Sequence, residues 1–407
     1  MQSLIDSMLS DEIQDFLLEH ENGDVQKLLL KQDTVHNVPT EFIAQQLTGR
    51  KKAKVKFKTF YNTRGIAFPP SINLEQSSSE ATAKFKLALL KSLYPDEEKI
   101  ISAADLTGGF GVDTQFLSLR AQHIDYIEPD TSLYEIAKHN HKLLNSHNQN
   151  NITHYNASAE DYLDTLDEPM DLLFLDPSRR KKTQKIFKLA DSEPNVVLLQ
   201  KELLQKATHV LIKTSPLMDI QQGCRELENV SQVIIVAVDN ECKELLFLLE
   251  KNFSGEPVIR IADLNHYGEI LSDFSFSLEA ERNAQISYSN PLTFLYEPSA
   301  ATLKAGAFKW IGEKFNLKKL APNSHLYTSS EPVDFPGRIF TILESLKLDK
   351  KINEKFPKGY ANIITRNYPL SVEEIKAKTG LKEGGEEYLI CTQGEKEKFV
   401  LLVERLK

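Results

Sequence analysis

Apolar residues follow two patterns along the chain, short continuous runs and helical periods. Six short apolar runs between residues 100 and 238 alternate with segments of helical periodicity. This alternation predicts a parallel sheet, because parallel neighbours need a crossover connection, usually a helix. The expected strands are Ile100–Leu106, Ile124–Glu128, Ile152–Asn156, Asp171–Asp176, His209–Thr214 and Val230–Val238.

A further apolar run, Lys243–Glu250, follows the last of these strands after the short turn at residues 239–241. A turn this short joins antiparallel strands. We therefore expect an α/β sheet that is parallel except for its final strand.

The residues before the sheet have a different pattern. Residues 1–48 have helical periodicity, and a helix is expected from about Ser79 to Leu93. Residues 52–58 alternate lysine with apolar residues, which predicts a strand with one basic face.

The pattern changes again after about residue 255. Gly337–Leu348 and Tyr360–Arg366 predict strands, and Ser371 with Glu374 predicts a capping box that starts a helix. Two later runs predict a hairpin across residues 393–395, which gives an α+β, ferredoxin-like module. The expected domains are an N-terminal mainly helical region at 1–75, the α/β domain at 76–254, a connecting α+β region at 255–330 and the C-terminal module at 331–407.

Composition narrows the class of protein. The chain is 41% hydrophobic and 26% charged, which is typical of globular proteins with a sizeable core. Three scattered cysteines favour a reducing cytoplasm over a disulfide framework. We expect no membrane span, because no run approaches ~20 apolar residues, and no metal site. A net charge of −9 argues against coating nucleic acid by bulk charge, but it allows a local basic surface.

A glycine-rich segment lies between the first expected strand and a helix. Glycines permit a tight turn and close approach of a ligand, and the helix N-terminus offers free N–H groups. Glu128 ends the next strand, where a carboxylate can accept the ribose hydroxyls of an adenosine cofactor. The residues expected to bind this cofactor are Asp105, Thr107, Gly108, Gly109, Gly111, Glu128, Asn156 and Ala157.

Two adenosine cofactors fit this pattern. NAD remains an alternative, because Gly109 and Gly111 also fit a dinucleotide turn. Asp105 favours S-adenosylmethionine, since the positively charged methionine moiety is stabilised by a carboxylate. A P-loop is excluded because no Gly-Lys-Ser/Thr follows the glycines, and the cysteines cannot form an iron–sulfur site.

The same motifs carry a family resemblance. Residues 76–180 resemble the RNA guanine-N2 methyltransferases of the trimethylguanosine-synthase group, in Ser78–Ala83, Asp105–Gly111, Glu128–Asp130 and Asp176-Pro177. The whole chain is similar to a bacterial group of class I methyltransferases with a C-terminal THUMP-like module, in Asp176–Arg180, Lys213–Pro216, Tyr296–Pro298, Lys304–Gly306 and Arg366–Pro369. The resemblance implies a Rossmann-like fold, S-adenosylmethionine as cofactor and, because THUMP modules bind RNA, an RNA partner.

The Asp-Pro loop departs from the pattern of amino-methylating enzymes. Those enzymes have Asp/Asn-Pro-Pro-aromatic, whereas here serine and arginine follow the proline. We expect Asp176 and Pro177 to orient the target amine and Arg179 to stack on the base. Arg180 and Lys213 are expected to bind substrate.

These features predict a methyltransferase that acts on a base of rRNA or tRNA. Two alternatives remain open. One is a methyltransferase of a small molecule or protein, which suits the acidic net charge, and the other is a non-catalytic RNA-binding protein that keeps the cofactor site. The basic run at residues 179–188 favours a phosphate-bearing substrate, because it begins at the Asp-Pro loop beside the expected methyl donor. The run at residues 50–58 mixes cations with aromatic residues, as single-strand-binding surfaces do, but a solvated strand face fits it slightly better.

Overall fold

The structure is a computed structural model that describes the chain except for residues 30–32, 97–100, 146–150, 180–187 and 407. It consists of two compact units. The first unit comprises Met1–Asp239, Lys243–Glu256 and Leu264–Ile270. The second unit comprises Asn240–Cys242, Pro257–Asp263 and Leu271–Lys407.

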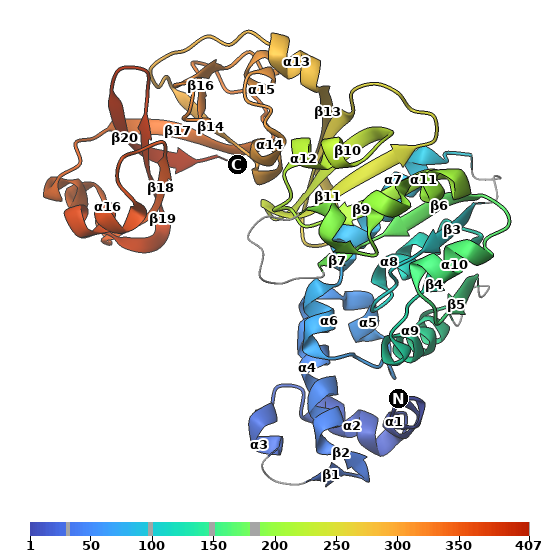
Figure 1. The fold of residues 1–407 in the computed structure, drawn as a ribbon. Coiled ribbons are helices and arrows are strands. Elements are labelled where there is room, and N and C mark those ends of the chain that lie inside the picture. Colours follow the sequence, from blue (N-terminus) through green and yellow to red (C-terminus); the bar gives the residue numbers. More distant parts are fainter. Residues whose placement is uncertain (30–32, 97–100, 146–150, 180–187, 407) are drawn as a thin grey trace. The chain divides into compact units, whose positions relative to one another are not determined.

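The first unit is built on a mainly parallel sheet (Figure 1). Seven strands follow each other in the order β10-β11-β9-β6-β3-β4-β5. The pairs from β9 to β5 are parallel, and β11 is antiparallel to β9. The expected Rossmann-like sheet with its antiparallel final strand is therefore confirmed. The strands are β3 (Ser102–Asp105), β4 (His123–Ile127), β5 (Ile152–Tyr155), β6 (Met170–Leu175), β9 (Ala207–Thr214), β10 (Val230–Val238) and β11 (Glu241–Glu250).

Crossover helices alternate with these strands. The helix expected from Ser79 is confirmed as α7 (Glu80–Leu93), with Ser79 as its N-cap accepting a hydrogen bond from the backbone N–H of Thr82. This cap satisfies one of the free N–H groups of the first turn. The other helices are α8 (Val112–Leu117), α9 (Thr131–Leu144), α10 (Ala159–Thr165), α11 (Val196–Lys206) and α12 (Ile220–Glu226).

The residues before the sheet form a mainly helical region, as expected. Its buried apolar side chains share one core with residues of the α/β domain, namely Ala83, Phe110, Val112, Phe116 and Ile136. The elements are α1 (Gln2–Met8), α2 (Asp11–Glu19), α3 (Val25–Leu29), β1 (Thr34–Val35), β2 (Val38–Pro39), α4 (Thr40–Lys56), α5 (Lys58–Asn62) and α6 (Ser71–Gln76).

The strand predicted at residues 52–58 is wrong, because this segment ends α4 and begins α5. In a strand, Ala53, Val55 and Phe57 would share one face. Ala53 and Phe57 are buried, as befits positions four apart on a helix, but Val55 is 81% exposed. Tertiary contacts decide the outcome, since the Lys56 ammonium donates to the Leu74 carbonyl at 2.7 Å.

The second unit contains a seven-stranded sheet in the order β15-β16-β14-β17-β20-β19-β18. The predicted capping box is confirmed at α16, where Ser371 and Glu374 exchange hydrogen bonds. The predicted hairpin is confirmed as the antiparallel pair β19–β20. The elements are β12 (Val258–Leu264), β13 (Ile270–Ser277), α13 (Leu278–Asn283), β14 (Phe294–Pro298), α14 (Ala300–Ala305), α15 (Trp310–Lys314), β15 (Lys318–Lys319), β16 (Tyr327–Ser329), β17 (Gly337–Ser345), β18 (Tyr360–Arg366), α16 (Val372–Thr379), β19 (Lys382–Gln393) and β20 (Lys398–Arg405).

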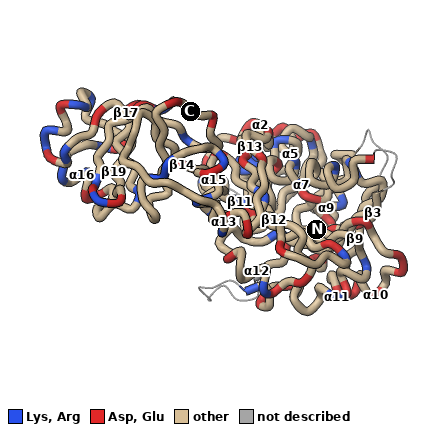
Figure 2. The backbone as a smooth tube through the Cα atoms, turned by 90° about the horizontal axis from the view of Figure 1, so that it is seen from above, with Lys and Arg blue, Asp and Glu red and all other residues tan. Residues whose placement is uncertain are grey.

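Charged residues of both signs are interspersed along both units (Figure 2). Within the described part of the chain, every helix is too short or too polar to span a lipid bilayer.

Candidate functional site

The glycine-rich loop begins at Asp105, the last residue of β3. The Asp105 carboxylate is buried and accepts hydrogen bonds from the Thr107 N–H at 3.2 Å and the Thr114 hydroxyl at 2.7 Å. Burial is the largest influence on this carboxyl, and it raises the pKa of Asp105 to about 7. Asp105 therefore fixes the start of the loop, and its charge state is sensitive to any cation placed beside it.

The glycines serve two different purposes. A Cβ on Gly108 would lie 2.2 Å from the ring of Tyr126 in β4, so only glycine lets the loop pack this closely against that ring. Gly109 has φ +54, and beyond its neighbours the nearest atom to a Cβ there would be the Thr107 carbonyl oxygen at 3.8 Å. The loop is therefore packed tightly on one side and is open beside Gly109.

Glu128 follows β4 and faces this loop. Its carboxylate accepts hydrogen bonds from the N–H groups of Gly109 at 2.8 Å and Asp130 at 2.9 Å. The side chain is buried, and burial raises the pKa of Glu128 against the opposing effect of these bonds. Gly111 ends the loop as the N-cap of α8, and its carbonyl lies 2.8 Å from the His141 Nε2. The structure thus brings together Asp105, Gly109 and Glu128 at the ends of two adjacent strands.

Asn156 and Ala157 follow β5 at the same edge of the sheet. The Asn156 amide donates to the carbonyls of Glu128 at 2.8 Å and Pro129 at 3.1 Å, and it accepts from the Thr131 hydroxyl at 3.0 Å. The Asn156 side chain therefore holds the loop after β4 in place, a positioning role that the sequence does not reveal. Ala157 is half-buried beside it.

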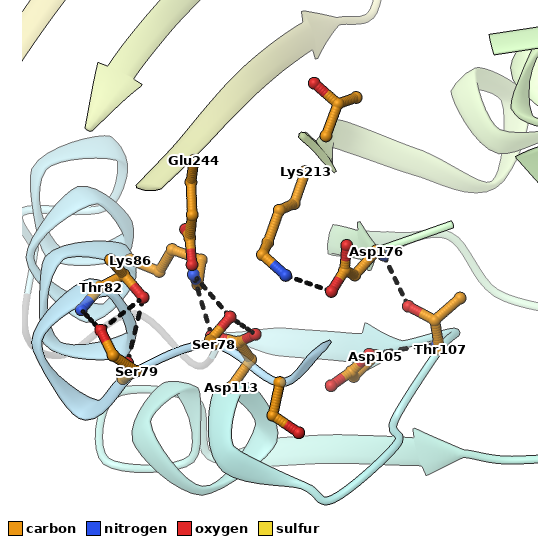
Figure 3. Close-up of polar contacts among 12 residues, drawn as sticks. Ser78, Ser79, Thr82, Lys86, Asp105, Thr107, Asp113, Asp176, Lys213 and Glu244 are labelled. Carbon is orange, nitrogen blue, oxygen red and sulfur yellow. Dashed lines mark hydrogen bonds and ion pairs between the residues drawn. The ribbon is translucent and has the colours of Figure 1, made fainter. Parts of the chain in front are cut away.

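Asp176 and Lys213 form an ion pair at the ends of β6 and β9 (Figure 3). The two strands are parallel and in register up to Leu175 and Ile212, so the next residues face each other. Burial opposes the charge of Lys213, but the carboxylates of Asp176, Glu244 and Asp113 outweigh it and raise the pKa of the lysine. The Asp176 N–H donates to the Thr107 hydroxyl at 2.6 Å, which ties this pair to the glycine-rich loop.

The residues after Asp176 are described only in part. Pro177 is buried, and Ser178–Arg179 form the short strand β7, which pairs with β8 (Ser192–Glu193). The Arg179 side chain, Arg180 and the rest of the basic run up to residue 187 lie outside the described residues.

A buried charged cluster that the sequence analysis missed lies next to this pair (Figure 3). The fully buried Lys86 ammonium lies 2.5 Å from the Glu244 carboxylate, 3.1 Å from Asp113 and 3.2 Å from the Ser78 hydroxyl. The Ser78 hydroxyl donates to Asp113 at 2.5 Å. Burial alone would raise the pKa of Glu244, but Lys86 and Lys213 hold it below its usual value. One feature of the sequence could have indicated this cluster, namely a charged residue at an apolar segment. Lys86 lies between the apolar residues Phe85 and Leu87 of α7, and Glu244 directly precedes the apolar part of β11.

Glu244 and Ser78 of the cluster also line a cavity of about 470 Å³. Lys213, Glu244, Ser78 and Thr82 line the cavity together with other residues of the first unit. Ligand pockets of ~300–1,000 Å³ are typical of small organic groups. Because Lys213 lines the cavity and also binds Asp176, the cavity and Asp176 share this lysine. Among the described residues, no cluster of His, Cys, Asp and Glu could hold a metal ion.

Comparison with known proteins assigns the second unit in part. Residues 294–336 match a family of ferredoxin-like domains, and residues 337–405 match the THUMP domain-like family. None of the curated proteins matches the chain.

One solved structure is similar over the whole chain. It is a Porphyromonas gingivalis protein described as a "putative methyltransferase", with 29% identity, a TM-score of 0.84, and coverage of 100% of this chain and 99% of that one. A "putative RNA methyltransferase" from Pyrococcus horikoshii covers 49% of this chain and 98% of its own, at 13% identity and a TM-score of 0.33. A "putative methyltransferase" from Streptococcus mutans in complex with SAH covers 41% and 96%, at 17% identity and a TM-score of 0.32.

TM-scores this low do not establish a shared fold, so the whole-chain match carries the comparison. It agrees with the strand order of the first unit, which is that of a Rossmann-like class I methyltransferase sheet. The chain therefore has the fold of the Porphyromonas protein, and its residues 294–336 and 337–405 belong to the ferredoxin-like and THUMP domain-like families.

Proposed function

We propose that the protein is an S-adenosylmethionine-dependent methyltransferase that acts on a base of rRNA or tRNA. The observation that carries the proposal is the meeting of three features at one edge of the sheet. These are the open glycine-rich loop, the Glu128 carboxylate across from it, and the Asp176–Lys213 pair on the next strands. Ligands of open α/β sheets bind outside the carboxyl ends of the strands, where these features lie.

The residues present fit the proposed cofactor. The space beside Gly109 is open, so a ligand can approach the backbone there. Glu128 is held by two N–H groups and has further lone pairs to accept ribose hydroxyls. Asp105, whose pKa is raised by burial, gains a favourable partner from a cationic methionine moiety. Thr107, Gly108, Gly111, Asn156 and Ala157 hold or flank the two loops.

The chemistry requires little of the protein beyond positioning. When bound, the cofactor supplies an electrophilic methyl group on a sulfonium, which an acceptor attacks in line. Asp176 accepts a hydrogen bond from the acceptor amine and aligns its lone pair, while Lys213 and the Thr107 hydroxyl fix the Asp176 residue. Such alignment can lower a barrier by ~7–11 kcal/mol. Pro177, Arg179 and Arg180 complete the proposed acceptor side.

The RNA substrate is supported by the second unit and by the cavity. Residues 337–405 match the THUMP domain-like family, and THUMP modules bind RNA. Lysines line the cavity beside Asp176. A protein or small-molecule substrate, the alternative left by the acidic net charge, is tested together with RNA.

The test is methyl labelling from radioactive S-adenosylmethionine, with total RNA and RNA-free extract from a strain that lacks the gene. We expect label in one rRNA or tRNA species, and none with Asp176→Ala. Label only in protein or in small molecules would overturn the RNA assignment. A calorimetric titration that detects no binding of S-adenosylmethionine would overturn the assignment as a methyltransferase.

A further inference from the structure

The cavity beside Asp176 has a distinctive set of charges. Among the described residues that line it, five are lysines and three are glutamates. The lysines are Lys56, Lys58, Lys84, Lys213 and Lys243, and the glutamates are Glu75, Glu80 and Glu244. Cations therefore exceed acids by two, in a protein whose net charge is −9. Lys84 pairs with Glu80 at 3.2 Å and Lys213 pairs with Asp176, which leaves Lys58 as an ammonium near the Tyr267 ring. The excess of lysines among the lining residues favours an anionic ligand group.

The cations gather with an aromatic ring at one wall of the cavity. The Lys58 ammonium lies 4.2 Å from the centre of the Tyr267 ring, and the Lys84 ammonium donates to the Tyr267 carbonyl at 3.2 Å. Tyr267 is 52% exposed, and its ring also contacts His266. An exposed ring beside ammonium groups offers both a stacking surface and phosphate donors, the combination found in proteins that bind single strands.

Four of the lining residues bring hydrogen-bond donors and acceptors to the cavity. Lys213 donates there, Glu244 accepts, and Ser78 and Thr82 carry hydroxyls. The glutamates of the same cavity reduce the attraction for a ligand that is anionic throughout. The edge of a nucleobase, by contrast, presents donors and acceptors side by side and can use groups of both kinds.

We propose that this cavity receives one unpaired nucleotide of RNA, with its phosphate at Lys58 and Lys84, its base against the Tyr267 ring, and the edge of the base directed to Lys213, Glu244 and the Ser78 hydroxyl. The inference rests on the proposed function and adds to it the form of the substrate. The target is a nucleotide that has left its helix or lies in a loop, because a base that is stacked and paired inside a duplex cannot enter a pocket. Lys58 and Tyr267 are thus substrate-binding residues.

The experiment uses the full chain saturated with S-adenosylhomocysteine and an RNA pentamer, pentauridylate with 4-thiouridine at its centre. Ultraviolet cross-linking and peptide mapping locate the nucleotide, and fluorescence anisotropy of a labelled pentamer gives its affinity. We expect cross-links at the cavity residues that the base would contact, within 78–82, at 213, within 243–244 or at 267. Tyr267→Leu should weaken binding about tenfold, because an aromatic surface for one base is lost. Tyr267→Phe, which keeps the ring, should bind like the wild type.

Lysine variants separate the phosphate contact from general charge. Lys58→Met should weaken binding several-fold, and more at low salt than at high salt, whereas the control Lys91→Met removes an exposed lysine of α7 outside the cavity and should change little. Cross-links confined to residues 271–407, or equal affinity for Tyr267→Leu and wild type, would overturn the inference. A hepta-aspartate peptide that displaces the RNA and binds Tyr267→Leu as well as wild type would assign the cavity to acidic peptides instead.

Calorimetry of the same preparations distinguishes the two levels of the argument. Binding of S-adenosylhomocysteine without RNA cross-links in the cavity overturns this inference and leaves the cofactor assignment standing. Loss of both overturns the proposed function as well.

Discussion

The Asp176 carboxylate is paired with the Lys213 ammonium, which favours its charged form against the effect of burial. With Lys213→Met the favourable cation is lost, so the pKa of Asp176 rises further above that of an ordinary aspartate. We expect methyl transfer to fall by about 10²-fold or more at pH 7 and to recover partly at higher pH, while cofactor affinity is unchanged. Rate–pH profiles and calorimetry measure the two effects. An unshifted pH profile would show that Lys213 does not act through Asp176.

Glu128 is the residue on which cofactor affinity should depend most. Removing the carboxylate in Glu128→Ala deletes its proposed bonds to the ribose and frees the N–H groups of Gly109 and Asp130. The loss of cofactor binding should be on the order of 2–4 kcal/mol, since bonds to a charged group contribute ~1.5–3 kcal/mol each with partial compensation. Calorimetry with S-adenosylhomocysteine checks this, with exposed Glu160→Ala in α10 as the control. Equal affinities for Glu128→Ala and wild type would remove the ribose assignment.

The raised pKa of Asp105 predicts a pH dependence of stability. The folded protein binds this proton more tightly than the unfolded chain, whose aspartate titrates near 3.8. The contribution of Asp105 is therefore fully present below pH 4 and is lost as the pH rises to about 7, by up to ~1.4 kcal/mol per pH unit. Urea unfolding of wild type and Asp105→Asn gives the free energy of unfolding of each at several pH values in this window. Plotted against pH, the two sets of free energies should converge or cross. Parallel curves would contradict the raised pKa.

At the scale of elements, the N-terminal helices support the glycine-rich loop. The Phe110 ring lies 5.5 Å from Phe57, 4.9 Å from Phe60 and 6.0 Å from Phe68, between ring centres. Because Phe110 is buried between two glycines of the loop, the helices fix the loop conformation through it. Phe110→Ala should lower the free energy of unfolding by about 3–5 kcal/mol, the usual cost of emptying a buried phenylalanine site. Denaturant unfolding tests this, and exposed Leu119→Ala should change stability by less than ~0.5 kcal/mol.

Elements were predictable from the sequence where local pattern and burial agree. The inner strands β3, β4 and β6 are short runs that are buried along most of their length, so their positions follow from hydrophobicity. The edge strand β5 is largely exposed apart from Ile152. The loop residues at Asp105, Glu128 and Asp176 were located because strand ends converge in any parallel sheet. The end of α4 was mistaken for a strand, since its lysines bind carbonyl and carboxylate groups of α6 that no local pattern reveals.

Pairings between distant residues explain the remaining misses. Lys86 and Glu244 lie 158 positions apart and meet only when α7 packs beside β11, so neither residue indicated a site by itself. The short elements between residues 255 and 335 could not be assigned, because strands as short as β15 and β16 depend on their neighbours in the sheet. Long-range pairing is information that local periodicity does not contain.

At the scale of the whole molecule, the second unit raises a question about its internal boundary. The sequence predicts a separate module from residue 331, yet β14 pairs with β17 across that position, and one core joins Leu295 and Leu326 to Phe340. If a cut near residue 331 let the two pieces separate, this core would be exposed to water, at a cost of ~25 cal/mol per Å² of apolar surface. We therefore predict that limited proteolysis of the full chain yields a stable C-terminal fragment that begins before Phe294. Mass spectrometry of the fragments decides, and a persistent fragment that begins near residue 331 would show that the last strands and α16 fold without β14.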